Sequence, residues 1–130
     1  MSNLTFTNTK LENKCRENHE GGIEYKFKLI ESTRLKMNRL TTQMLYRFIQ
    51  GDGMAEYYIG VMDDGKVVGL NESELYSTIT AILECLDRLG GFYTSILVYN
   101  QTDRGINASK KYCIHIKIKI DKLPNTAIGL

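Results

Sequence analysis

The sequence predicts an α+β fold, a two-layer sandwich in which a five-stranded mixed sheet is covered by two amphipathic helices. Two segments of helical length carry one apolar stripe each, and five shorter segments have the pattern of strands. A chain of 130 residues is long enough for one core and too short for two ordinary ones. We therefore expect one domain over residues 23–122 with the element order βαββαββ.

The two ends of the chain are predicted to lie outside this domain. Residues 1–22 lack periodicity and end in Gly21-Gly22, so they are predicted to be a flexible arm. Residues 123–130 are predicted to be a short C-terminal tail.

The domain is predicted to begin with a strand and a helix. Apolar and charged side chains alternate over residues 23–29, which is the period of a half-buried strand. A helix is predicted over residues 32–50, ending at Gly51-Asp52-Gly53. Its apolar residues form one stripe at 100° per residue, and the opposite ridge is basic and polar. This ridge consists of Lys36, Arg39, Gln43, Tyr46, Arg47 and Gln50.

A hairpin and a second helix are predicted next. Residues 56–61 and 66–70 have strand patterns and are joined by a turn that contains Asp64-Gly65, a strong hairpin signal. Asn71 is a predicted N-cap, with Glu74 three residues later to complete a capping arrangement. The helix keeps one apolar stripe up to Leu89 and is predicted to end at Gly90.

Two strands are predicted to complete the sheet, over residues 92–99 and 111–120. In the last one, isoleucines alternate strictly with polar residues. If the isoleucines face the helices, the other side of this strand presents a basic row on an open sheet surface. The row consists of Lys111, His115, Lys117 and Lys119.

The charge is segregated along the chain, although the net charge is only +2. Residues 24–47 hold six basic and two acidic residues, residues 51–90 hold two and eight, and residues 104–122 hold six and one. Such segregation predicts one basic and one acidic face, and a basic face suits a phosphate backbone. RNA binding is the function that these patterns favour.

Several other classes of function find no support in the sequence. No apolar run is long enough for a membrane span, and three cysteines without a pairing framework indicate a reducing, cytoplasmic location. The segment from Gly60 to Val67 comes within one residue of a phosphate-loop pattern, but Val67 replaces its Ser or Thr. We expect no enzyme activity, no cofactor and no metal.

Ordered blocks of the sequence resemble a known family. They are Ile23-Glu-Tyr-Lys-Phe-Lys-Leu-Ile30, Leu40-Thr-Thr-Gln-Met-Leu-Tyr-Arg47, Gly51-x-Gly53, Tyr58-Ile-Gly-Val61, Asp64-Gly65 and Val68-Gly-Leu70. These blocks are similar to the region that precedes the GTPase domain in the GTP-binding protein 1 and 2 family of elongation-factor-like GTPases. The resemblance continues less sharply to Val98, and Met54 replaces an acidic residue that is usual in the family.

The resemblance implies a stand-alone relative of that accessory domain, without GTP hydrolysis. A free-standing version of the domain looks like the dormancy factors of microsporidia, small proteins that occupy the tRNA exit site of idle ribosomes. It implies a monomer that contacts rRNA and ribosomal proteins there and competes with deacylated tRNA. The predicted contacts are Arg39, Gln43 and Arg47 on the helix ridge, and Lys111, His115, Lys117 and Lys119 on the sheet.

A second resemblance supplies the alternative hypothesis. The strand around Glu24 and the hairpin of residues 60–65 also look like the AlbA-related domain of Schlafen-type proteins, some of which cut tRNA or rRNA with a carboxylate-held metal. Glu20, Glu24 and Asp63 are the carboxylates available for such a site. They have to converge to hold a metal ion.

Overall fold

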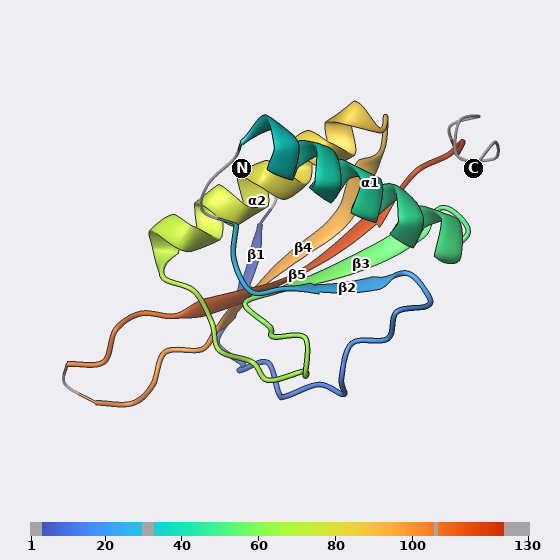
Figure 1. Ribbon diagram of the computed structural model, residues 1–130. Helices are drawn as coiled ribbons and strands as arrows, with labels where there is room; N and C mark the ends of the chain where they lie inside the picture. The colour runs from blue at the N-terminus through green and yellow to red at the C-terminus, as the bar shows by residue number, and fades with distance from the viewer. Residues whose placement is uncertain (1–3, 30–32, 106, 124–130) are drawn as a thin grey trace.

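The computed structural model describes residues 4–29, 33–105 and 107–123. Five strands form one sheet: β1 (Thr5–Thr7), β2 (Ile23–Lys26), β3 (Met54–Ile59), β4 (Phe92–Asn100) and β5 (Tyr112–Lys119). Helices α1 (Arg34–Gln50) and α2 (Glu72–Arg88) lie side by side over one face of this sheet (Figure 1). The predicted α+β class, with a five-stranded mixed sheet and two helices, is confirmed.

The sheet has the strand order β1-β4-β5-β3-β2. β5 lies in the centre and is antiparallel to both β3 and β4. β1 is parallel to β4, and β2 is parallel to β3, so β5 alone runs against the other four strands. The basic row predicted on this last strand therefore lies in the middle of the sheet and not at its edge.

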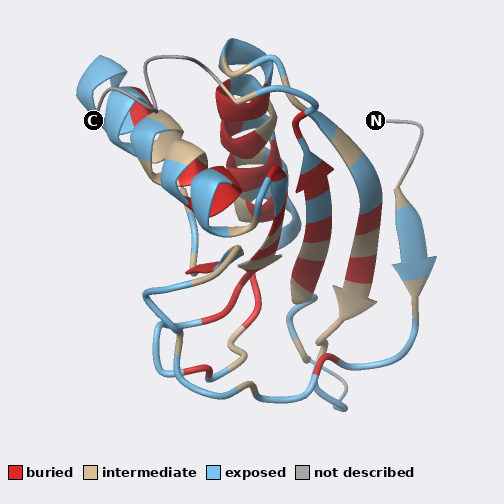
Figure 2. Cartoon of the chain, turned by 90° about the vertical axis from the view of Figure 1, so that its right-hand side faces the viewer, coloured by how far each residue is buried: buried red, intermediate tan, exposed pale blue. Residues whose placement is uncertain are grey.

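The core lies between the helices and the sheet (Figure 2). The predicted stripes point into it: Met44 and Phe48 of α1, Ile79 and Ile82 of α2, and the isoleucines of β5 are buried. α2 begins as predicted, because Asn71 Oδ1 accepts from Glu74 N at 2.8 Å and Glu74 Oε1 accepts from Asn71 N at 3.2 Å.

Neither described helix is long and apolar enough to cross a membrane.

One predicted strand is not part of the sheet. The turn after β3 exists, since Met62 N donates to Lys66 O at 2.9 Å, but residues 66–70 form only two isolated bridges, Val61 to Val67 and Leu70 to Tyr112. The chain bends at Gly60 and again at Gly69, which both have positive φ, and this leads the hairpin away from the sheet. The element order is therefore ββαβαββ, and the fifth strand is β1.

The segment predicted as a flexible arm is packed on the domain over its described part, residues 4–22. It supplies β1 and then passes the hairpin on the side of the sheet opposite the helices (Figure 1). There Lys14 N donates to Gly65 O at 2.8 Å and Glu17 N donates to Asp63 O at 2.7 Å. A Cβ on Gly65 would lie only 2.1 Å from Lys14 O, so glycine permits this approach. Residues 1–3 and, in the predicted tail, residues 124–130 lie outside the described residues.

Candidate nucleic-acid interface

On the sheet face opposite the helices, the described residues of the N-terminal segment cover one half and leave the other half, called here the uncovered half, without a covering segment. In the covered half, Leu11 packs with Tyr25, Val61 and Cys113 to form a second, smaller apolar cluster. The Tyr25 hydroxyl donates to Cys15 O at 2.9 Å, which joins β2 to the N-terminal segment. This half is therefore occupied by the protein's own chain.

The uncovered half carries cationic and apolar side chains in neighbouring rows. Cross-strand pairing places Met54, Lys119 and Phe92 in one row and Glu56 and Lys117 in the next. Directly paired residues share a face of the sheet, so these side chains lie together. Lys117 and Lys119 are exposed, as predicted for the open side of β5. Met54 and Phe92 are 61% and 43% exposed, and no local sequence pattern predicts their place beside these lysines.

His115 lies on the predicted face but is enclosed by partners. Its ring stacks on Tyr58 with 4.3 Å between centroids, and its Nε2 lies 2.7 Å from Glu56 Oε1. Burial lowers the pKa of His115 below its ordinary value, despite the opposing effect of Glu56. His115 is therefore mainly neutral at pH 7, and its role as a cationic RNA contact is not supported by this geometry.

Lys111 stands apart from the other predicted sheet residues. It precedes β5, and its backbone N–H donates to Thr102 Oγ1 at 3.0 Å. Lys117 lies six positions further along the extended chain, a distance of roughly 20 Å. Lys117 and Lys119 thus form a pair that does not include Lys111.

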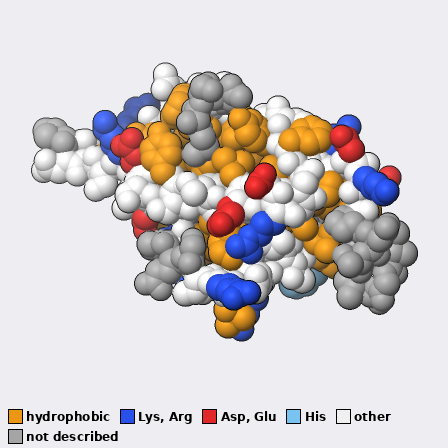
Figure 3. All heavy atoms as spheres, turned by 90° about the horizontal axis from the view of Figure 1, so that it is seen from above, with side chains coloured by type: hydrophobic (Ala, Val, Ile, Leu, Met, Phe, Trp, Pro, Cys, Tyr) orange, Lys and Arg blue, Asp and Glu red, His pale blue; other side chains and the backbone are white. Residues whose placement is uncertain are grey.

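The predicted ridge of α1 is partly exposed. Arg39 is exposed and Gln43 is half-buried, and both line a groove of about 310 Å³ together with Lys26, Lys36, Leu29 and Leu40. α1 has four basic residues and no acidic ones, whereas α2 has four acidic residues and one basic one. From the side of the helices, blue, red and orange groups alternate without one continuous basic field (Figure 3).

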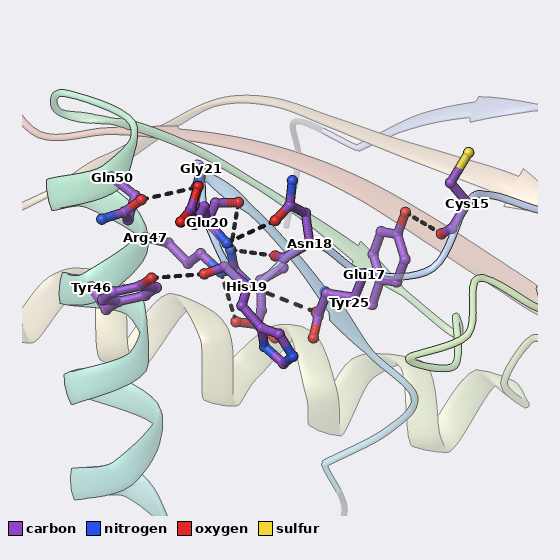
Figure 4. A network of polar contacts seen from close by, with 11 residues as sticks. Cys15, Glu17, Asn18, His19, Glu20, Gly21, Tyr25, Tyr46, Arg47 and Gln50 are labelled. Carbon is purple, nitrogen blue, oxygen red and sulfur yellow. Dashed lines mark hydrogen bonds and ion pairs between the residues drawn. The ribbon is translucent and has the colours of Figure 1, made fainter.

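Arg47 is not a surface residue, and its prediction as an exposed RNA contact is wrong. Its side chain is only 3% exposed, and its Nε donates to Glu24 Oε1 at 3.0 Å. Its Nη1 donates to the carbonyl oxygens of Asn18 at 2.9 Å and Gly21 at 3.0 Å (Figure 4). A helical wheel places Arg47 on the ridge, but the segment before β2 covers that end of α1 and takes up the guanidinium group.

A second carboxylate completes this network. Glu17 Oε2 lies 3.9 Å from Arg47 Nη2 and accepts a hydrogen bond from Tyr25 N. Burial, and the hydrogen bond that the protonated Glu24 carboxyl donates to Glu17, raise the pKa of Glu24 to about 7, although Arg47 opposes the shift. Below about pH 7 Glu24 therefore keeps its proton, because the single guanidinium group of Arg47 cannot compensate two negative charges.

We expect this proton to make stability depend on pH. The folded pKa of Glu24, about 7, exceeds its ordinary value of 4.5. Its stabilising contribution is therefore complete below about pH 4.5 and is lost as pH rises through about 7. Urea unfolding between about pH 5 and 8 should show this loss in the wild type and a smaller one in Glu24→Gln. Equal slopes in the two proteins would contradict the assignment.

The carboxylates of the alternative hypothesis do not assemble a site. Glu24 is paired with Arg47 on the helix side of the sheet. Across the residues that the structure describes, no group of three or more His, Cys, Asp or Glu side chains is arranged to hold a metal ion. Glu20, Glu24 and Asp63 therefore do not form the metal site that the alternative hypothesis requires.

Comparison with known proteins gives three similar chains, and no protein-family model matches. GTP-binding protein 2 of Mus musculus is 31% identical over 109 residues, which are 84% of this chain and 17% of that protein. GTP-binding protein 2 of Homo sapiens is 37% identical over 78 residues, 60% of this chain and 13% of that protein. The similarity supports kinship with the GTP-binding protein 2 family.

The third relative is a viral protein of unknown role. Uncharacterized protein R625 of Acanthamoeba polyphaga mimivirus is 32% identical over 118 residues, which are 90% of this chain and 56% of that protein. The chain thus spans less than a fifth of GTP-binding protein 2 and about half of the viral relative. The resemblance to the GTP-binding protein family that the sequence blocks indicate is supported over this segment.

Proposed function

We propose that the protein is a ribosome-associated factor that binds rRNA and has no catalytic role. The similarity to GTP-binding protein 2 over most of the chain carries this proposal. The sequence blocks resemble the same family, whose members are elongation-factor-like GTPases. The uncovered half of the sheet supports it, because Lys117 and Lys119 are exposed there and suit a phosphate backbone.

The relative's name refers to GTP, but GTP binding is not part of this proposal. The segment that approaches a phosphate-loop pattern, residues 60–67, forms a hairpin turn after β3. Asp64 caps this turn by accepting from Lys66 N at 2.9 Å. A phosphate loop instead joins a strand directly to a helix N-terminus and has no carboxylates against the phosphate.

The more specific proposal is that the protein is a dormancy factor like microsporidian dormancy factor 1. It then occupies the tRNA exit site of idle cytoplasmic ribosomes as a monomer and excludes deacylated tRNA. Opposite charges on the two helices are compatible with such a site, since α1 can face rRNA while the acidic α2 faces basic ribosomal proteins. The lysines of the sheet offer a further RNA contact on the opposite side.

Co-sedimentation with vacant ribosomes tests both levels of this proposal. We expect stoichiometric binding that weakens as salt rises, because phosphate contacts release counterions. Added deacylated tRNA should displace the protein if it occupies the exit site. Absence of binding at low salt would refute the ribosomal role, whereas binding that tRNA leaves unchanged would refute only the exit site.

A further inference from the structure

The uncovered half of the sheet contains a groove with mixed chemistry. The groove has a volume of about 250 Å³ and crosses β3, β5 and β4. Its lining consists of Met54, Ala55, Glu56, Thr94, Lys117, Ile118 and Lys119. Phe92 pairs with Lys119 across the strands, so it extends the row of Met54 and Lys119 on this face. Two large exposed apolar side chains thus flank a lysine above a shallow groove.

This combination is unusual for a merely solvated surface. Met54 and Phe92 are among the most exposed large apolar residues in the described part of the chain, and both lie at the same end of the sheet. Exposed apolar groups that gather among charged ones mark contact surfaces. The groove is lined by two lysines and one carboxylate, Glu56, which is hydrogen-bonded to His115, so its net charge is positive.

The lysines of the groove favour an anionic ligand, and the exposed apolar side chains beside them favour a ligand that also has planar, uncharged groups. Lys117 and Lys119 lie two residues apart on one strand, about 6.6 Å along its axis. This distance is similar to that between successive phosphates in an extended nucleotide chain. Single-stranded RNA combines such phosphates with bases that stack on aromatic side chains, and open sheet faces present aromatic residues to RNA in this way.

The other aromatic cluster of this face is less suited to stacking. The Tyr58 ring is stacked on His115, Tyr25 meets it edge-on at 6.0 Å, and Lys14 Nζ lies 4.7 Å from its centroid. The Tyr58 ring is thus engaged within the protein, and Tyr25 is buried. Phe92, at the exposed end of the sheet, has no described ring contact of this kind.

We propose that this groove binds single-stranded RNA, with one unpaired base stacked on Phe92 beside Met54 and the adjoining phosphates held by Lys117 and Lys119. The proposal rests on the proposed rRNA-binding function and assigns it a surface and a substrate class. It predicts that the protein recognises an unpaired rRNA segment in preference to a duplex.

Direct binding to short RNAs tests the groove independently of the ribosome. Fluorescence anisotropy with labelled single-stranded oligoadenylate and oligouridylate, and with a duplex of the same length, measures the affinities. We expect the single strands to bind more tightly than the duplex. Phe92→Leu should weaken single-strand binding about 5- to 150-fold, the range for loss of one stacked base, and Phe92→Tyr should retain it.

The aromatic substitutions separate stacking from a hydrophobic contact with protein. Leucine keeps apolar surface and removes the π-face, so a protein-binding surface would tolerate Phe92→Leu. Equal RNA affinities of wild type and Phe92→Leu would overturn the proposal, as would absence of binding to both single strands at low salt. If only the groove assignment is mistaken, the wild-type protein still co-sediments with ribosomes. If the ribosomal role is mistaken as well, co-sedimentation is also lost, so the failure of one proposal can be told from the failure of the other. Unchanged thermal unfolding of Phe92→Leu confirms that the variant is folded.

Discussion

Replacing Arg47 by Ala is expected to lower the free energy of unfolding by about 3–5 kcal/mol, which is the usual effect of removing one partner from a buried ion pair. The loss leaves the Glu24 carboxylate buried without its cation, on the apolar side of the sheet. It also removes the donor that joins α1 to the carbonyl groups of Asn18 and Gly21. Urea unfolding followed by circular dichroism measures the change.

The same substitution should release the segment before β2. Residues 17–21 are held against α1 by Arg47, by Tyr46, whose hydroxyl donates to His19 O, and by Gln50, which accepts from Gly21 N. We expect faster hydrogen exchange at Tyr25 N, which donates to Glu17, and faster tryptic cleavage after Arg16 in Arg47→Ala.

Arg39→Ala is the matched control, because Arg39 lies on the same helix and is exposed. Its effect should remain within about 0.5 kcal/mol. The double variant Glu24→Leu/Arg47→Met replaces both charges by apolar groups and should recover much of the stability lost by Arg47→Ala alone. A loss below about 1 kcal/mol in Arg47→Ala would show that the ion pair does not anchor the segment.

The elements with strong local signals could be predicted from the sequence. The Asn71 and Glu74 capping box, the alternation of isoleucines in β5 and the apolar stripes of both helices depend on residues close in sequence. β1 could not be predicted in this way, because three residues have no useful period and pair only with the distant β4. In the hairpin after β3 a local signal was present but predicted too much. Its turn was predicted correctly, whereas residues 66–70 do not form the predicted strand of the sheet.

The candidate site was predictable only in part, for the same reason. Lys117 and Lys119 follow from the alternation in β5, because the opposite side of that strand is buried. Met54 and Phe92 become neighbours of Lys119 only through the pairing of three strands. Arg47 was predicted to be exposed although it is buried. Helical periodicity indicates which side of α1 Arg47 lies on, but it does not show that residues 17–21 cover that side.

Reversing both Lys117 and Lys119 to Glu is expected to weaken ribosome binding about tenfold or more and to change its salt dependence. Each phosphate contact with a single strand contributes about 0.7 to the slope of log affinity against log salt, so loss of two contacts should reduce the slope by about 1.4. Both side chains are exposed in the middle strand, so the variant should remain folded. Co-sedimentation over a salt series measures affinity and slope together.

The control for this prediction is Lys110→Glu/Lys111→Glu, which changes the net charge by the same amount on the chain that leads into β5. If the lysines on the uncovered sheet contact RNA, this control should lose less affinity than Lys117→Glu/Lys119→Glu and keep more of the salt slope. Equal losses in both double variants would mean that binding follows the overall charge of the protein. In that case the sheet lysines act through long-range attraction, and the contact surface has to be sought along α1, where Arg39 is exposed and no carboxylate belongs to the helix.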